Sequence, residues 1–341
     1  IGFYKPRSHE VVNCYECMLQ SPAAMAAADA LRQFMEEDNI TSYDPRWEKG
    51  LMRHMIVRTA MGTGQVMVIL VINGKGIPNA AKLIQMLDDA IFDVPAYEEG
   101  PLAGIEFSLE SVVININKKN TSDILGEECI TLAGSPTIME KVGDLEFEIS
   151  PLSFYQVNPQ QMEKLYGKVV EYADLKGGET VLDLYCGVGS IGLFLANDMR
   201  NKGDDAGRVI GIESVKPAVI DANRNAVVNG IVNARYVCGK AEEEMPKMVS
   251  GEGLKDESLR ITQADVVILD PPRAGCEEEL LKAVVDVDPA KIVYVSCDPA
   301  TLARDIKFLT ANGYEFVEAT PVDMFPWTGH VEAVTLLVKA Q

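Results

Sequence analysis

The stretch V-L-D-L-Y-C-G-V-G-S-I-G, residues 181–192, decides the fold class of this chain. Its first half is a strand-like apolar run that contains one acidic residue, Asp183. Its second half contains Gly187, Gly189 and Gly192, which form a G-x-G-x-x-G pattern. Glycines at this spacing, between a strand and a helix, let a ligand such as a pyrophosphate approach the backbone. The stretch therefore predicts one strand, turn and helix of an open α/β sheet.

Strands and helices alternate from residue 151 to the C-terminus, which is typical of a mostly parallel sheet with helices on both faces. The last two expected strands have no helix between them, so they should form an antiparallel hairpin at the sheet edge. Seven strands that end this way are typical of the methyltransferase variant of the doubly wound fold. The expected strands are 180–185, 208–213, 234–238, 265–269, 291–296, 315–320 and 332–338, and the expected helices are 190–197, 217–229, 277–285 and 299–311.

The first 150 residues have a different pattern, rich in short β-like runs. We expect three parts in the chain. Residues 1–40 form an N-terminal loop and helix segment, residues 41–150 form a small α+β central domain, and residues 151–341 form the α/β domain. The elements expected before residue 151 are helices at 22–37 and 78–90 and strands at 51–60, 66–74, 104–109, 111–117, 130–133 and 145–149.

The composition is that of a folded soluble protein, with 47% apolar and 24% charged residues. No run of about 18 apolar residues exists, so we expect no membrane-spanning helix. The first residues lack both an initiator Met and the apolar core of a signal peptide, so we expect part of a longer gene product. Seven cysteines at irregular spacing favour a reducing, cytoplasmic location over a disulfide framework.

The net charge of −20 argues against a nucleic-acid partner, because phosphate binding normally requires a basic surface. The acidic excess is evenly spread along the chain. Residues 1–150 have 12 basic and 22 acidic residues, and residues 151–341 have 19 and 29, so each part carries −10. Any RNA hypothesis must outweigh this observation.

The glycine pattern alone does not distinguish NAD from S-adenosylmethionine (SAM). Glu213, at the end of the next strand, could bind ribose hydroxyls in either case. Asp183 does distinguish them, because a carboxylate beside the glycine turn would repel a pyrophosphate but attract the sulfonium and ammonium groups of SAM. We therefore expect Asp183, Gly187, Gly189 and Glu213 to bind SAM. The alternative for Asp183 is an aspartate that only caps the glycine turn.

Two further strand ends carry reactive groups: V-V-I-L-D-P-P-R-A-G (266–275) and I-V-Y-V-S-C-D-P-A-T-L-A-R-D (292–305). Ligands of open α/β sheets bind outside the carboxyl ends of strands, so Asp270, Arg273 and Cys297 should face the glycine turn. Methyltransferases of exocyclic amines have an aromatic residue after D-P-P, where this chain has Arg273. RNA cytosine carbon-5 methyltransferases have a cysteine after a proline at the same place. Neither pattern is present, which leaves Cys297.

A cysteine at this position suits methylation of uracil at carbon-5. Addition of a thiolate to carbon-6 makes carbon-5 nucleophilic, and a general base must then remove the carbon-5 proton. Glu332, in W-T-G-H-V-E-A-V, is the candidate base. Both residues have structural alternatives: Cys297 could be a small buried residue, and Glu332 an ordinary edge-strand glutamate.

Five segments together resemble the RNA 5-methyluridine methyltransferases, in that family's order. The resemblance implies a class I SAM-dependent methyltransferase with Cys297 as nucleophile and Glu332 as base. It also implies that Gln156, Tyr185, Glu213 and Asp270 contact SAM and that Gln156 and Asp270 lie close to the target uracil, although Gln156 could equally cap a turn. The segments are S-F-Y-Q-V-N-P (153–159), D-L-Y-C-G-V-G (183–189), D-P-P-R-A-G (270–275), S-C-D-P-A-T-L-A-R-D (296–305) and G-H-V-E (329–332).

The form S-F-x-Q-V-N-P-x-Q is closer to the ribosomal-RNA branch of that family, which implies 23S rRNA as the substrate. The same chemistry on tRNA is the first alternative. A non-catalytic RNA-binding or RNA-folding protein is the second, but it would need neither Cys297 nor Glu332. A dehydrogenase is the third.

Members of the ribosomal branch usually begin with a β-barrel RNA-binding domain and cysteines for an iron–sulfur cluster. This sequence has no such barrel, and only Cys17, with Cys14 nearby, matches a cluster ligand. A cluster needs four thiolates, so we expect a 4Fe–4S cluster only in a longer form. We expect a monomer that binds RNA, weakly without the barrel, and neither DNA nor a membrane. Arg273 and the segment K-P-R-S-H (5–9) are candidate phosphate contacts, or solvated surface charges.

Overall fold

The computed structural model describes residues 1–341 except 7, 9, 101, 122, 205 and 341. Arg7 and His9, both in the segment 5–9 predicted to contact phosphate, thus lie outside the described residues. The chain divides into two compact units. The first comprises Ile1–Lys141 and Glu148–Leu152, and the second comprises Val142–Phe147 and Ser153–Gln341.

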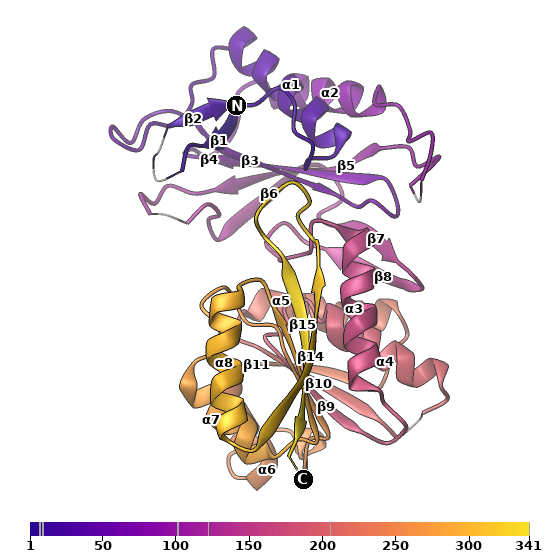
Figure 1. Ribbon diagram of the computed structural model, residues 1–341. Coiled ribbons are helices and arrows are strands. Elements are labelled where there is room, and N and C mark those ends of the chain that lie inside the picture. Colours follow the sequence, from indigo (N-terminus) through magenta and orange to yellow (C-terminus); the bar gives the residue numbers. More distant parts are fainter. Residues whose placement is uncertain (7, 9, 101, 122, 205, 341) are drawn as a thin grey trace. The chain divides into compact units, whose positions relative to one another are not determined.

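The first unit is a four-stranded sheet in the order β3-β4-β5-β6, with helices α1 and α2 packed on one face (Figure 1). Every second residue of β4, from Val66 to Ile72, is buried against these helices. Helix α1 begins where Ser21 Oγ accepts a hydrogen bond from Ala24 N (3.1 Å), and Pro22 follows in the first turn. The elements are β1 (Gly2–Tyr4), β2 (Val11–Asn13), α1 (Pro22–Glu37), β3 (Met52–Thr59), β4 (Gln65–Ile72), α2 (Ala80–Phe92), β5 (Ser108–Ile116) and β6 (Glu128–Gly134).

The prediction of two strands at 104–109 and 111–117 was wrong, because β5 is one strand. Its pairing with β4 shifts by one residue between Leu109 and Ser111, so Glu110 is the extra residue of a bulge and not a break. Residues 104–107 are a turn and loop. The expected strand 145–149 is observed as β8 (Leu145–Ile149), but its hairpin partner β7 (Ile138–Val142) was not predicted.

The second unit has a seven-stranded sheet in the order β11-β10-β9-β12-β13-β15-β14. The first five strands are parallel, and β15 is antiparallel to both β13 and β14, which confirms the predicted fold class and edge hairpin. The chain order reverses between β9 and β12, which makes the carboxyl ends of these two strands the switch point of the sheet. The strands are β9 (Thr180–Leu184), β10 (Arg208–Glu213), β11 (Ala234–Cys238), β12 (Val266–Leu269), β13 (Lys291–Ser296), β14 (Tyr314–Val322) and β15 (Glu332–Lys339).

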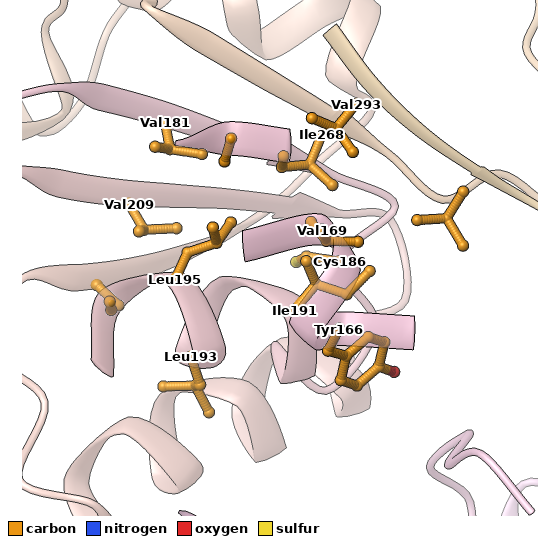
Figure 2. Close-up of a cluster of buried hydrophobic side chains, with 14 of the residues drawn as sticks. Tyr166, Val169, Val181, Cys186, Ile191, Leu193, Leu195, Val209, Ile268 and Val293 are labelled. Carbon is orange, nitrogen blue, oxygen red and sulfur yellow. The ribbon is translucent and has the colours of Figure 1, made fainter. Parts of the chain in front are cut away.

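Helices cover both faces of this sheet and create two buried clusters. Helices α3, α4 and α5 pack on one face, and α6, α7 and α8 pack on the other (Figure 1). In the first cluster, Val181 of β9 and Ile268 of β12 meet Val169 of α3 and Ile191 of α4 (Figure 2). The helices are α3 (Pro159–Ala173), α4 (Ser190–Asn201), α5 (Lys216–Val228), α6 (Ala241–Ser250), α7 (Glu278–Val287) and α8 (Pro299–Ala311).

Two of these helices were not predicted. Helix α3 has clear local signals, since Asn158 Oδ1 accepts a hydrogen bond from Gln161 N (3.3 Å) and Pro159 opens the first turn. Its buried residues recur at helical spacing from Met162 to Tyr172. Helix α6 has weaker signals, because Pro246 lies inside it and three consecutive glutamates occupy its first turn.

Candidate active site

The predicted site residues gather at the carboxyl edge of the seven-stranded sheet. Asp270, directly after β12, donates its backbone N–H to Leu184 O at the end of β9 (3.3 Å). The glycine turn follows β9, Glu213 ends β10, and Cys297 follows β13. Strand β15 runs the opposite way, so its first residue, Glu332, lies at the same edge.

The glycine turn has a fixed left-handed backbone. Tyr185, Gly187 and Gly189 have φ of 63°, 53° and 79°. Gly187 N donates to Glu213 Oε2 (3.2 Å), which ties the turn to the end of β10. A Cβ on Gly189 would lie 2.6 Å from the ring of Tyr236, whose hydroxyl donates to Gly189 O (3.0 Å). The turn therefore requires a glycine at position 189, where the backbone lies against an aromatic ring.

Asp183 is completely buried under this turn. Its Oδ2 accepts a hydrogen bond from Gly192 N (2.9 Å), so the aspartate does cap the start of α4. Its Oδ1 has no hydrogen-bond partner among the residues that the structure describes. Burial raises the pKa of this carboxyl to about 7, and the charge of Glu213 adds to the effect. Capping thus accounts for one oxygen only, and the other is a buried acceptor that folding leaves without a partner among the described residues.

Cys297 directly follows β13, and Glu332 begins the adjacent antiparallel strand β15. The last residues paired between β13 and β15 are Ser296 and Ala333. The same register, continued by one residue, places Cys297 opposite Glu332, and directly opposite residues of an antiparallel pair have neighbouring side chains. Cys297 is half-buried, and Glu332 is 6% exposed.

Some charges around Cys297 raise the pKa of its thiol, and another lowers it. Burial raises the pKa of the Cys297 thiol, and the carboxylates of Glu332 and Asp270 raise it further, whereas the Arg273 guanidinium lowers it. Burial also raises the pKa of Glu332, which Arg273 opposes. Burial raises the pKa of Asp270 to about 8, with contributions from Glu332 and Asp183. Three carboxyl groups therefore interact here, which favours a ligand with positive charge.

The loop that carries Arg273 is fixed to helix α8 by hydrogen bonds that sequence reasoning missed. Arg304 donates from Nη2 to Ala274 O and to Cys276 O (both 3.0 Å), and Thr301 Oγ1 donates to Arg273 O (3.2 Å). Gly275, with φ of 75°, lets the loop pass close to the Arg304 side chain.

Asp305 is the buried centre of this anchor. Its Oδ2 accepts hydrogen bonds from Cys276 N (2.8 Å) and from the Tyr294 hydroxyl (2.6 Å), and its Oδ1 accepts one from Arg304 Nε (2.8 Å). Asp305 is 1% exposed. Both Arg304 and Asp305 belong to the quoted segment 296–305, but only the tertiary structure shows that they hold a different loop.

Gln156 is joined to the glycine turn through two residues that were also missed. Its side chain is hydrogen-bonded to the Tyr166 hydroxyl, which lies 3.0 Å from Ser190 Oγ at the first residue of α4. Burial raises the pKa of Tyr166, and the charges of Asp270 and Asp183 add to the effect. Figure 2 shows the Tyr166 ring beside Ile191 at the edge of the apolar cluster.

Tyr185 has a different environment from the other predicted residues. Its ring packs against the cluster under α6, α7 and α8. Burial raises the pKa of its hydroxyl, and Cys276, Glu242 and Glu277 contribute. The structure therefore places its backbone in the glycine turn and its side chain beside the first turns of α6 and α7.

The metal and membrane predictions concern other parts of the chain. Cys14 and Cys17 are half-buried free thiols. Within the part of the chain that the structure describes, no three His, Cys, Asp or Glu side chains are grouped so that they could hold a metal ion. Among the described residues, no helix combines the length and the apolarity that a membrane span requires.

Known proteins resemble this chain over nearly its whole length. A family model described as tRNA (uracil-5-)-methyltransferase matches residues 137–340. An uncharacterized RNA methyltransferase of Caldanaerobacter subterraneus subsp. tengcongensis is 46% identical over 338 residues, which are 99% of this chain and 68% of that protein. One of Clostridium acetobutylicum is 42% identical, over 99% of this chain and 67% of that protein. This chain thus spans about two thirds of the length of these relatives.

A solved structure resembles both units. The tRNA (uracil-54, C5)-methyltransferase of Pyrococcus abyssi, in complex with S-adenosyl-L-homocysteine, has 30% sequence identity and a TM-score of 0.74 over 98% of this chain and 72% of that chain. The chain belongs to the tRNA (uracil-5-)-methyltransferase family, as the resemblance in the sequence predicted. Its second unit has the Rossmann-like fold of class I SAM-dependent methyltransferases.

Proposed function

We propose that this chain methylates uracil at carbon-5 in RNA, with SAM as the methyl donor and Cys297 as a covalent nucleophile. The observation that carries the proposal is the register of β13 and β15, because its continuation by one residue beyond Ser296 and Ala333 sets Cys297 opposite Glu332. A thiol and a carboxyl group at neighbouring positions are the two groups that the reaction needs, one to add to the ring and one to remove a proton.

The residues around the glycine turn fit SAM. The unsatisfied Oδ1 of Asp183 is an acceptor for a cationic ligand, and the open space around Gly187, where a Cβ would meet nothing within 4 Å, leaves room for a ligand beside the backbone. Glu213 suits the ribose hydroxyls. When bound, SAM supplies an electrophilic methyl group. The other contacts that we assign to it are Gln156, Tyr185 and Asp270.

Cys297 starts the reaction on the uracil ring. Its thiolate forms a bond to carbon-6, and the electron pair of the carbon-5–carbon-6 double bond moves to make carbon-5 nucleophilic. Carbon-5 then takes the methyl group. Cys297 is half-buried, so part of the residue is accessible to a base that has left its RNA stack.

Glu332 completes the reaction. Its carboxylate accepts the carbon-5 proton, the electron pair restores the double bond, and the sulfur–carbon-6 bond breaks. Burial raises the pKa of Glu332, which makes its carboxylate a stronger base than an exposed glutamate. The charge of Arg273 opposes the rise in the pKa of both Glu332 and Cys297, so it favours their ionised forms.

The target base is held by groups with donors and acceptors. We assign Gln156 and Asp270 to the polar edge of the uracil, because both interact with the Tyr166 hydroxyl beside the glycine turn. Burial raises the pKa of Asp270 to about 8, so near neutral pH its carboxyl group can donate a hydrogen bond to a carbonyl oxygen. Arg273, which is exposed, is our candidate for a phosphate contact.

For the RNA class we propose 23S ribosomal RNA, on the basis of the segment S-F-Y-Q-V-N-P-Q-Q (153–161). The P. abyssi relative is a tRNA enzyme, which makes tRNA the alternative. Incorporation of labelled methyl groups into 23S rRNA fragments and into tRNA transcripts, measured side by side, distinguishes them. Methylation of tRNA alone would contradict the ribosomal assignment.

The covalent mechanism is tested with RNA in which 5-fluorouridine replaces the target uridine. Fluorine cannot leave as a proton, so an RNA–protein adduct that survives denaturation should accumulate in the presence of SAM. Cys297→Ala should form no adduct. Cys129→Ala, which removes a half-buried thiol of the first unit, is the matched control and should form it normally. Adduct formation by Cys297→Ala, or its absence in the unaltered chain, would rule out the mechanism.

A further inference from the structure

The loop between β14 and β15 presents one large side chain to solvent. Trp327 is 82% exposed, more than any other large apolar residue in this loop. Its backbone is in the left-handed region, with φ of 68°. Bulky residues rarely adopt this conformation. An exposed indole on such a backbone contributes little to folding, so its presence calls for another explanation.

The loop itself is well anchored on both sides of Trp327. Thr328 donates from its backbone N (3.1 Å) and from Oγ1 (2.8 Å) to Phe325 O, and His330 N donates to Thr328 Oγ1 (3.1 Å). The Phe325 side chain packs against the apolar core, and Met324 is 1% exposed. The indole is therefore held out from a fixed turn.

The loop is also connected to the candidate active site. Glu332 follows Trp327 by five positions, so their Cα atoms are at most about 18 Å apart. On its other side, Met324 O accepts a hydrogen bond from Asn158 Nδ2 (3.3 Å), two residues after Gln156. The nucleotides next to a uracil bound at Cys297 and Glu332 are thus within reach of the indole.

We propose that Trp327 is a substrate-contact residue on which a base next to the target uridine stacks. The inference rests on the proposed function, because it takes RNA as the substrate. Extrusion of one base leaves its neighbours without a stacking partner, and an exposed aromatic ring replaces that partner for any base identity.

The charge of the chain supports this assignment. A net charge of −20 limits what phosphate contacts can add to RNA affinity. Stacking on an indole does not depend on releasing counterions, so it stabilises the complex without a basic surface. Recognition around the target uridine should therefore have a component that salt does not weaken.

The test compares binding of a short single-stranded RNA, containing the target uridine, to Trp327→Ala, Trp327→Phe and Trp47→Ala. Trp47, which is 72% exposed in the first unit, is the matched control. We expect Trp327→Ala to weaken binding about 5- to 150-fold, the range for loss of one stacked base. The slope of log K against log salt should not change. Trp327→Phe should keep most of the affinity, and Trp47→Ala all of it.

A second measurement uses fluorescence. The chain has two tryptophans, so Trp47→Phe leaves Trp327 as the reporter, and stacking of a base should quench its emission. Unchanged RNA affinity in Trp327→Ala, or unquenched emission with RNA bound, overturns the inference. The 5-fluorouridine adduct is an independent readout. If it forms while Trp327→Ala binds RNA normally, the proposed reaction stands and the stacking role falls. If no adduct forms while Trp327→Ala still weakens RNA binding, the stacking role stands and the proposed reaction falls.

Discussion

Cys297, the residue after β13, and Glu332, the first residue of β15, lie one residue beyond the last pair of these strands, Ser296 and Ala333. The relationship depends on the direction of β15. In a fully parallel sheet the first residue of a strand lies at the edge opposite to the ligand site, whereas an antiparallel β15 starts at the carboxyl edge of β13. The reversed strand therefore brings a carboxyl group to a cysteine at a strand end.

Glu332→Gln tests the role of the base. The amide keeps the shape of the side chain but cannot accept the carbon-5 proton, so turnover should fall by about 10²–10⁴-fold. The adduct with ordinary uridine RNA should then persist after denaturation, because its breakdown requires that proton to leave. Glu315→Gln, an exposed glutamate of β14, is the control and should turn over normally. Normal turnover in Glu332→Gln would exclude Glu332 as the base.

Asp183→Asn tests whether Asp183 binds a cationic ligand, and it should change how the stability of the chain depends on pH. The pKa of Asp183 is raised from 3.8 to about 7 in the folded chain, so its ionisation opposes folding. The stability that depends on the protonated carboxyl is fully present below about pH 4 and is lost as the pH rises through about 7. Without ligand, Asp183→Asn should therefore gain stability relative to the unaltered chain over this range, by at most a few kcal/mol.

The same substitution should weaken SAM binding by at least about tenfold, because it removes the charge that faces the cationic ligand. Thermal unfolding from pH 4 to 8 and calorimetric titration with SAM measure the two effects. Equal stability profiles together with unchanged SAM affinity would show that Asp183 acts only as a helix cap.

Asp305→Ala tests the anchor of the Arg273 loop. It removes the acceptor of hydrogen bonds from Cys276 N, the Tyr294 hydroxyl and Arg304 Nε, and it leaves the first two donors buried without a partner. The free energy of unfolding should fall by about 2–4 kcal/mol. SAM affinity should change little, because Asp183 and the glycine turn are not part of this network.

Denaturant unfolding and SAM titration of Asp305→Ala provide the measurements, with the exposed Glu318→Ala as a control. A positioning role also predicts that the pH profile of turnover shifts, since Arg273 lowers the pKa of both Cys297 and Glu332. Loss of stability with an unchanged pH profile would indicate that Asp305 has a structural role only.

Local sequence patterns predicted those elements whose bounds are set by their own residues. The strands β10, β11 and β13 have the predicted bounds. The buried parallel strands β10 and β13 are mostly continuous apolar runs between turn residues. Strand β5 was divided in the prediction because a bulge at Glu110 looks like a break when the partner strand is unknown. Asp270 and Cys297 were proposed as site residues because each directly follows a predicted strand.

The residues that support them could not be found in this way. The spacing of apolar residues in α3 predicts only that Tyr166 is buried. The fold is needed to bring its hydroxyl to Gln156 and Ser190. Asp305 lies in the second turn of α8, and only the packing of α8 against β13 brings its carboxylate to Cys276 N, in the loop that carries Arg273. Such roles depend on contacts between segments distant in sequence, which a single sequence does not specify.

Alanine substitutions at Gly187 and Gly189 distinguish two reasons for glycine in this turn. One is the left-handed backbone, and the other is the lack of room for a side chain. Both residues have positive φ, 53° and 79°, so each substitution should cost about 1–2 kcal/mol for the left-handed backbone. A Cβ at position 187 meets nothing within 4 Å, whereas a Cβ at position 189 would lie 2.6 Å from the Tyr236 ring. That ring cannot retreat easily, because its hydroxyl is bonded to Gly189 O and the residue is buried. Gly189→Ala should therefore cost about 2–5 kcal/mol in total and weaken SAM binding by distorting the turn. Denaturant unfolding of the two variants, followed by SAM titration, measures the difference, and equal losses of stability would show that the Tyr236 ring does not limit the turn.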